Sequence, residues 1–276
     1  MRLKRTRALL AMSIGTAAAV LMTASPAQAA TITDITTLLE DMSSHAYPPF
    51  GFEVTGTPIL ITESDAVPVG SAKVVSSAPF YLGCASLTNS TSSDQTLTSH
   101  SFSKAFTNTV STTVTTGVSS TSKVSGSFSL SKVVGLGLEE SVTVSYQDSE
   151  TQSESIKETH TAPSQKVFVP AQKTRYVVSS LTQSTYTGEL ALNANFTGGF
   201  TAKSLNGPLP LVLNIYDTLS RAEDRGGQLP TGFSLNSSTK RLDFQGTGTY
   251  TVKAGANFRV EVLETLPGGL KTSQCS

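Results

Sequence analysis

The segment Phe106–Tyr146 has the sequence FTNTVSTTVTTGVSSTSKVSGSFSLSKVVGLGLEESVTVSY, and its large apolar residues fall almost entirely on one parity of residue number. The even positions carry Phe106, Val110, Val114, Val118, Val124, Phe128, Leu130, Val134, Leu136, Leu138, Val142, Val144 and Tyr146. The odd positions carry mainly Ser, Thr and Gly, among them Ser125, Ser127, Ser129, Ser141, Thr143 and Ser145. Because successive side chains of a β-strand point to opposite faces, this alternation predicts a long ribbon with one apolar face and one hydroxyl face.

Two kinds of structure use such a ribbon. A soluble sheet packed on a core also alternates, but ordinary strands run only ~5–6 residues between turn signals. No Pro, Asn-Gly or Asp-Gly interrupts Val110–Tyr146, whereas each strand of a transmembrane β-hairpin has ~9–11 alternating residues. The length therefore favours a membrane-inserting hairpin, with a core sheet as the alternative.

The first 29 residues have the features of an export signal. Arg2, Lys4, Arg5 and Arg7 precede an apolar run, Ala8–Met22, and the small-residue motif Ala-Gln-Ala ends at Ala29. Such a segment is removed on export, so we expect a secreted protein that begins near Ala30.

The composition of the remaining chain excludes several classes of protein. Four of the 20 basic residues lie in the signal, so the exported chain has 16 basic against 20 acidic residues. This balance argues against nucleic acid as a partner, since nucleic-acid-binding proteins usually carry a basic face. No run of 18 apolar residues remains, which excludes a transmembrane helix. Low charge and abundant Ser and Thr favour an all-β fold.

The two cysteines, Cys84 and Cys275, suit an oxidising space outside the cell. A disulfide between them is the favoured interpretation, and two unpaired thiols are the alternative, since sequence does not reveal whether their Cα atoms approach.

The flanking segments are mostly β in character. A short helix is predicted from Thr31 to about Ser44, with Asp34 at its start, because apolar residues recur there at helical spacing. Strands are predicted over 57–87, 174–200, 208–219 and 241–266, and the charged, Gly-rich segment 220–232 is predicted to be an exposed loop. Arg221 and Arg225 in that loop mark either a protease site or plain solvent-exposed chain.

Three aromatic residues, Tyr47, Phe50 and Phe52, gather around Pro48, Pro49 and Gly51. Aromatic side chains on a Pro-rich loop often form a binding surface, and they equally often plug the end of a sheet. Both interpretations stay open at this point, and receptor binding is the functional one.

No constellation of residues predicts catalysis. His45, His100 and His160 are isolated from one another, and none has the spacing of a metal site. The sequence contains no GxSxG, phosphate loop, HExxH or CxxC motif. We therefore predict no enzyme activity, no metal and no cofactor.

The ribbon and its flanks resemble a known family. The segments that carry the resemblance are LTNSTSSDQTLTSHSF (87–102), VSYQDSETQSESIKETHTAPSQKVFVPAQKTRYVV (144–178) and FQGTGTYTVKAGANFRVEV (244–262), and the most specific part is Ala162-Pro163-Ser164-Gln165 followed by VFVPA (167–171). Together they resemble the epsilon-toxin and mosquitocidal-toxin branch of the aerolysin-like β-pore-forming toxins. The resemblance implies an elongated molecule of long antiparallel strands that binds a cell surface through a receptor, assembles into a homo-oligomeric ring and inserts one hairpin per subunit.

On this basis we expect four parts: a signal at 1–29, an N-terminal region with the aromatic loop at 30–85, a pore-forming domain at 86–180 and a C-terminal β-sandwich at 181–276. The insertion hairpin covers about 118–146. Its lipid-facing residues are Val118, Val124, Phe128, Leu130, Val134, Leu136, Leu138, Val142 and Val144, and its lumen-facing residues are Ser125, Ser127, Ser129, Ser141, Thr143 and Ser145. In the soluble form the apolar face is expected to lie against the protein's own sheet.

The position of the hairpin tip has two candidates. Ser131–Gly135 leaves arms of about the spanning length on each side, and Ser119–Lys123 is the competing turn. Lys132 and Glu140 share the parity of the apolar face, where a charge at mid-bilayer costs ~2–4 kcal/mol for Lys and less for Glu. A secreted β-sandwich adhesin or carbohydrate-binding module without pore activity is the alternative function.

Overall fold

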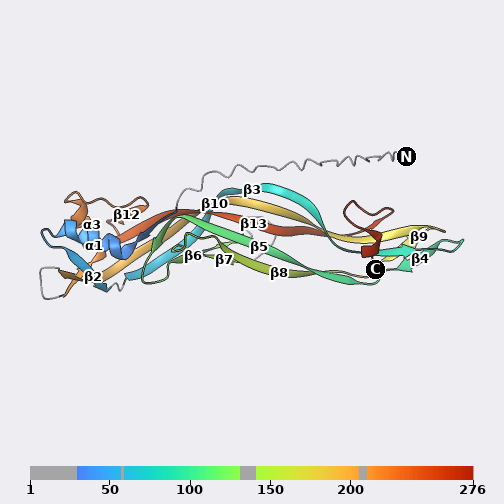
Figure 1. Cartoon of the computed structure of the whole chain (residues 1–276), viewed down its shortest axis with the longest axis horizontal. Helices are drawn as coiled ribbons and strands as arrows, with labels where there is room; N and C mark the ends of the chain where they lie inside the picture. The colour runs from blue at the N-terminus through green and yellow to red at the C-terminus, as the bar shows by residue number, and fades with distance from the viewer. Residues whose placement is uncertain (1–29, 57–58, 131–140, 205–209, 276) are drawn as a thin grey trace, which may run out of the picture.

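The computed structural model describes residues 30–56, 59–130, 141–204 and 210–275, which form an elongated, mostly antiparallel β molecule with two helices at one end (Figure 1). The helical end contains β1 Thr31–Asp34, α1 Ile35–Ala46, β2 Phe52–Gly56, β11 Pro210–Asn214, α3 Ile215–Glu223 and β12 Phe233–Asn236. The long strands are β3 Ile59–Thr88, β5 Phe102–Ser119, β8 Gln152–Ala162, β10 Thr174–Ser204 and β13 Arg241–Leu263. The remaining elements are β4 Gln95–Thr98, β6 Ser125–Ser129, β7 Ser141–Ser145, β9 Lys166–Val169 and the short 3-10 helix η1 Thr272–Gln274.

The main sheet is built around β10. This strand of 31 residues pairs with β13 along one edge and with β3 along the other, β13 pairs in turn with β5, and β5 pairs with β8, all antiparallel. Near its C-terminal end β10 pairs instead with β2 and β11. At ~3.3 Å per residue a straight strand of this length spans roughly 100 Å, so β10 sets the long axis of the molecule.

The predicted N-terminal helix is confirmed from Ile35 onward, whereas Thr31–Asp34, which the prediction included, form strand β1. Helix α1 begins after Asp34, whose side chain accepts a hydrogen bond from the Thr37 amide at 3.0 Å, as an N-cap residue does. Its apolar residues Ile35, Leu39 and Met42 are buried.

The prediction of a strand through 208–219 is wrong beyond Asn214. There the chain turns into helix α3, capped by the Asn214 side chain, which accepts from the Asp217 amide at 3.2 Å. Ile215, Leu219 and Ala222 recur at helical spacing and are buried, so packing outweighed the strand preference of the Ile-Tyr pair. The predicted loop 220–232 is likewise helical up to Glu223.

The largest hydrophobic core runs from the helices at one end to the middle of the sheet, where the β6–β7 hairpin packs. A smaller core lies under the β4–β9 pair at the opposite end (Figure 1). Beside that pair, the specific motif Ala162–Gln165 joins β8 to β9, and its Gln165 is held by two bonds to Ser99: Ser99 N–H to Gln165 O at 2.9 Å and Gln165 N–H to Ser99 Oγ at 3.0 Å. The motif therefore fixes the turn at this end of the molecule.

Candidate functional site

The candidate site is the hairpin formed by β6 and β7. The two strands pair antiparallel from Ser125 opposite Ser145 to Ser129 opposite Ser141. Among the residues that the structure describes, they form a two-stranded sheet of their own and share no ladder with the main sheet. The hairpin is therefore attached to the body by side-chain packing and a few individual hydrogen bonds.

The apolar face of the hairpin is buried against the main sheet. The residues concerned are Val124, Phe128, Leu130, Val142, Val144 and Tyr146, all of them in the largest core. Phe128 meets Tyr250 of β13, with ring centroids 5.7 Å apart. The expectation that the apolar parity lies against the protein's own sheet in the soluble form thus agrees with the described part of the hairpin.

Gly126 is the point of closest approach between hairpin and body. A Cβ added there would lie 2.5 Å from the Asp65 carbonyl carbon and 2.6 Å from the Ala66 nitrogen, both in the backbone of β3. Next to it, Ser64 of β3 donates its hydroxyl to the Ser125 carbonyl at 2.7 Å. Strand β6 therefore crosses directly over β3, which only a glycine permits at this position.

Tyr146 anchors the other arm. Its hydroxyl donates to the carbonyl of Asp65 in a short bond and lies 3.3 Å from the carbonyl of Asn193. Its backbone links three segments, because Tyr146 N–H donates to Val124 O at 3.0 Å and Val118 N–H donates to Tyr146 O at 3.2 Å. Tyr146 is thus the residue at which hairpin, β3, β5 and β10 meet.

The ribbon expected to be continuous from Phe106 to Tyr146 is interrupted at Ser120–Val124. There the chain leaves β5 in the main sheet and enters β6. The Gln147 side chain donates to the carbonyls of Ser120 and Ser122 at 3.0 Å each, which holds this connection in place. Val118 accordingly lies at the end of β5 and not in the observed hairpin, although it is fully buried on the same side.

The hydroxyl face of the hairpin points mainly to solvent. Ser127, Ser141 and Thr143 are exposed, and Ser125 and Ser129 are half-buried. Ser145 is buried, and its backbone is held by Gln152, which accepts from Ser145 N–H at 3.1 Å and donates to Ser145 O at 3.0 Å. The favoured tip Ser131–Gly135 lies outside the described residues, as do Lys132, Glu140, Val134, Leu136 and Leu138.

The aromatic loop forms a second candidate site at the helical end of the molecule. Tyr47 and Phe52 meet edge to face with centroids 5.9 Å apart, and they line a hollow of ≈ 270 Å³ together with Phe50. Phe52 is buried, at 7% exposed, while Phe50 is 46% exposed. One ring of the loop is thus buried at the end of the sheet and another faces solvent, and receptor binding by this loop stays a prediction.

Other walls of this hollow come from residues that the sequence did not connect to the aromatic loop. Leu211 and Leu213 of β11 line it, with Arg221 of α3 and Arg225 just after that helix. The guanidinium of Arg221 lies 4.7 Å from the centroid of the Tyr47 ring, and its Nε donates to Ala46 O at 3.0 Å. These contacts join segments about 170 residues apart, for which the sequence carries no local signal.

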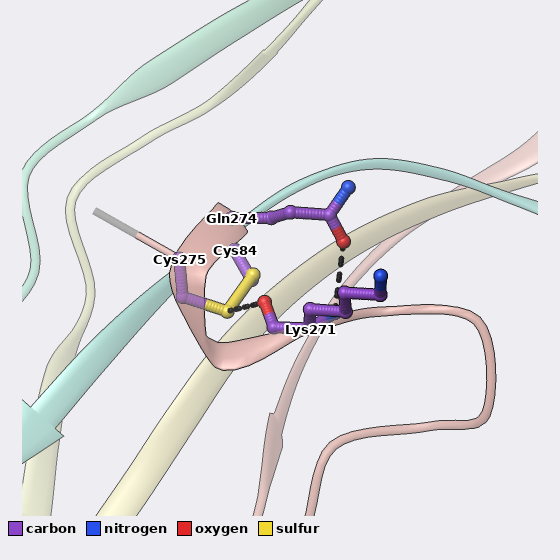
Figure 2. Close-up of a disulfide and its surroundings, with 4 residues drawn as sticks. All are labelled: Cys84, Lys271, Gln274 and Cys275. Atoms are coloured by element: carbon purple, nitrogen blue, oxygen red, sulfur yellow. Dashed lines mark hydrogen bonds between the residues drawn. A yellow bond between two sulfur atoms is a disulfide. The ribbon is translucent and has the colours of Figure 1, made fainter.

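The two cysteines form the predicted disulfide, which links β3 to the residue that follows η1 (Figure 2). The Cα atoms lie 4.6 Å apart, and 191 positions separate the residues in sequence. Lys271 N–H donates to the Gln274 side-chain oxygen at 2.8 Å, which shapes the turn that carries Cys275 to β3 (Figure 2). The disulfide lies near the end of the molecule opposite to the helices (Figure 1).

Grouped metal ligands and long apolar helices are absent from the part of the chain that the structure describes. No three His, Cys, Asp or Glu residues there are grouped so as to hold a metal ion. None of the described helices has the length and hydropathy needed to span a membrane.

The family is decided by a sequence profile described as Clostridium epsilon toxin ETX/Bacillus mosquitocidal toxin MTX2, which matches residues 35–276. This chain belongs to the epsilon toxin/mosquitocidal toxin family. The resemblance identified from the ribbon and from the Ala162–Gln165 motif is thereby confirmed. The protein is an aerolysin-like β-pore-forming toxin by family, and the family is not known for enzyme activity. No curated protein matches the sequence.

Solved structures share the fold of this family member at low sequence identity. The Mpp75Aa1.1 β-pore-forming protein from Brevibacillus laterosporus is 23% identical with a TM-score of 0.58, over 84% of this chain and 90% of that one. A non-toxic crystal protein from Bacillus thuringiensis is 22% identical with a TM-score of 0.65, over 86% of this chain and 99% of that one. Both confirm the elongated all-β, aerolysin-like fold.

Proposed function

We propose that this epsilon toxin/mosquitocidal toxin family member is a secreted toxin that binds a target-cell surface, assembles into a homo-oligomeric ring and inserts a β-barrel built from one hairpin per subunit. The observation that carries the proposal is the hairpin of β6 and β7, whose two strands pair with each other and with no other described strand, and which buries an apolar face beneath a hydroxyl face. The same two faces suit a barrel wall, with lipid on one side and water on the other.

In this proposal each residue of the hairpin stays on the same face of its strand. The apolar face moves from the protein's own sheet to lipid, and the hydroxyl face lines the water-filled lumen. The lipid-facing set is Val118, Val124, Phe128, Leu130, Val134, Leu136, Leu138, Val142 and Val144, and the lumen-facing set is Ser125, Ser127, Ser129, Ser141, Thr143 and Ser145. Burial of each Val, Leu or Phe side chain contributes roughly 1.5–3 kcal/mol. The apolar face therefore leaves the sheet only when lipid replaces it.

Assembly is part of the mechanism for a physical reason. A single hairpin in a bilayer would leave the backbone N–H and C=O groups of both edges unpaired, at a cost of several kcal/mol for each group. Pairing with hairpins of neighbouring subunits removes these edges when the barrel closes. Insertion is accordingly expected to follow ring formation.

Receptor binding is assigned to the aromatic loop at the helical end. Phe50 is exposed beside Tyr47, and the hollow they line lies on the described surface away from the hairpin. Attachment there leaves the hairpin free to move.

A reversible tether between hairpin and body tests the proposal. The variant carries Ser64→Cys and Ser125→Cys, at positions held together by the hydrogen bond from the Ser64 hydroxyl to the Ser125 backbone carbonyl at 2.7 Å, and a non-reducing gel verifies that the tether has formed. We expect the oxidised variant to release no dye from susceptible cells or liposomes, and the reduced variant to release dye as the unmodified protein does. The single variant Ser125→Cys should release dye in both conditions.

The reductant also acts on Cys84–Cys275, so the unmodified protein under the same reductant is the required reference. Dye release by a variant whose tether is intact on a non-reducing gel would show that the hairpin does not have to leave the body. Absence of release from every membrane by the reduced and unmodified proteins alike would favour the adhesin alternative.

A further inference from the structure

Exposed apolar side chains gather at the helical end of the molecule. Phe50 is 46% exposed on the loop before β2, while Leu211 and Val212 of β11 are 44% and 83% exposed. Phe50 and Leu211 line the same hollow, whereas Val212, the next residue of the strand, points to the opposite face of β11. Exposed apolar side chains on both faces of one strand, beside an exposed aromatic ring, mark an interaction site, unlike apolar residues that are scattered singly.

Two guanidinium groups border this surface. Arg221 is fixed by its contact with the Tyr47 ring and by its bond to Ala46 O. Arg225 is exposed on the same wall, and no ion pair of the described residues involves it. The described residues that line the hollow include no acidic side chain. Glu223 and Asp224 precede Arg225 in the chain but do not line the hollow, so the charged groups that the described lining contributes are two arginines.

The arginine side chains of the hollow determine which class of ligand it favours. An aromatic cage by itself suits a quaternary ammonium group, but Arg221 already occupies the Tyr47 ring and repels a cation. Guanidinium groups prefer phosphate and carboxylate oxygens, while Phe50, Leu211 and Val212 require an apolar environment beside that anion. An anionic headgroup next to hydrocarbon satisfies both demands.

We propose that this end of the molecule docks directly on anionic phospholipid headgroups of a membrane. Arg221 and Arg225 bind the headgroup oxygens, and Phe50, Leu211 and Val212 enter the interfacial layer. The inference rests on the proposed function, because it names the ligand of the surface to which cell attachment is assigned above.

Vesicle co-sedimentation tests this inference with two compositions, phosphatidylcholine alone and phosphatidylcholine mixed with phosphatidylserine. We expect the protein to bind the mixed vesicles and to bind phosphatidylcholine alone far more weakly. Arg225→Gln should weaken binding to the mixed vesicles about fivefold, and Val212→Ser should weaken it on the order of tenfold.

Matched controls alter the same residue types elsewhere on the surface. Arg259→Gln removes an exposed arginine of β13, and Val74→Ser removes a valine of β3 that is 58% exposed. Both variants should bind the mixed vesicles as the unmodified protein does. Circular dichroism of all four variants verifies that they are folded.

The outcomes separate this inference from the proposed function. Lysis of cells without binding to either vesicle would overturn the lipid inference in favour of a protein or glycan receptor, and would leave pore formation intact. An equal loss in Arg225→Gln and Arg259→Gln would overturn it in favour of general attraction to charge. Binding to mixed vesicles that depends on Arg225 and Val212, without dye release from any membrane, would support the docking surface and count against the pore.

Discussion

Gly126 allows β6 to lie on the backbone of β3, and this contact is set by a missing side chain. A Cβ there would approach the Asp65 carbonyl carbon and the Ala66 nitrogen at 2.5 and 2.6 Å. We expect Gly126→Val to destabilise the soluble protein by about 1–3 kcal/mol, as overpacking does. The partly undocked hairpin should raise binding of the dye ANS, and chemical denaturation measures the loss of stability.

Gly268 is the matched control for this substitution, because nothing lies within 4 Å of a Cβ added there. Gly268→Val should leave both the denaturation midpoint and ANS binding unchanged. Equal stability of Gly126→Val and Gly268→Val would mean that β6 does not rest on β3 in solution.

The two buried tyrosines at the hairpin interface differ in one respect. The Tyr146 hydroxyl donates to the carbonyl of Asp65 and lies 3.3 Å from that of Asn193, whereas the Tyr250 hydroxyl has no hydrogen-bond partner among the described residues. Tyr146→Phe removes the hydrogen bond of a buried side chain, so it should lower the free energy of unfolding by about 0.5–1.5 kcal/mol. Tyr250→Phe should leave it unchanged or raise it, and urea denaturation of the pair provides the comparison.

Tyr250 also predicts how stability responds to alkali. Burial raises the pKa of its hydroxyl above the ordinary value of 10.0. Above that value the unfolded chain has lost the proton while the folded protein keeps it, so the free energy of unfolding falls as the pH rises. Measured from about pH 9 to about pH 11, the decline should be shallower in Tyr250→Phe than in the unmodified protein, and parallel curves would contradict the prediction.

At the scale of the element, the β6–β7 hairpin shows which structural features can be predicted from alternation in the sequence and which cannot. In the described segments 124–130 and 141–146, parity predicted which large apolar side chains are buried, and of the hydroxyl parity only Ser145 is buried as well. The interruption at Ser120–Val124 overlaps the competing turn Ser119–Lys123 named from the sequence, but its form depends on the Gln147 side chain and on the backbone of Tyr146, which alternation does not reveal. Nor did it predict Gly126 as the contact with β3, which is a tertiary approach.

The hydroxyl face of the hairpin provides a prediction for the pore. Thr143 is exposed in the soluble form, so a charge there should change stability by no more than about 0.5 kcal/mol. In the proposed barrel the same position lines the lumen, where Thr143→Lys should favour anions and Thr143→Glu cations. Reversal potentials in planar bilayers under a salt gradient measure the shift, and identical potentials for both variants would exclude Thr143 from the lumen.

At the scale of the whole molecule, the fold class and the family were accessible from the sequence because long alternating segments and one specific turn motif carry them. The helical end was less accessible. Helix α3 was expected to be a strand, and the meeting of Tyr47 with Arg221 depends on packing between distant segments. The predicted boundary between the pore-forming domain and the C-terminal β-sandwich, at residue 180, stays a prediction. Strand β10 runs across it without a break, from Thr174 to Ser204.

The disulfide predicts a global effect on stability. It restricts the unfolded chain across a loop of 191 positions, and loops of this size give a stabilisation of about 2–5 kcal/mol in the chain-entropy account. The double variant Cys84→Ser, Cys275→Ser should show this loss in chemical denaturation, and the unmodified protein under reductant should match it. Equal denaturation midpoints with and without the bond would mean that the Cys84–Cys275 disulfide does not stabilise the folded protein.

The Cys84–Cys275 bond also closes a covalent loop of the chain that contains every described strand from β4 to β13. A protease that cuts this loop once leaves the two pieces joined by the disulfide. The pieces should migrate as one band on a denaturing, non-reducing gel and as two bands after reduction. In the proposed toxin, a single nick within this loop would thus leave both pieces covalently joined for as long as the disulfide stays oxidised.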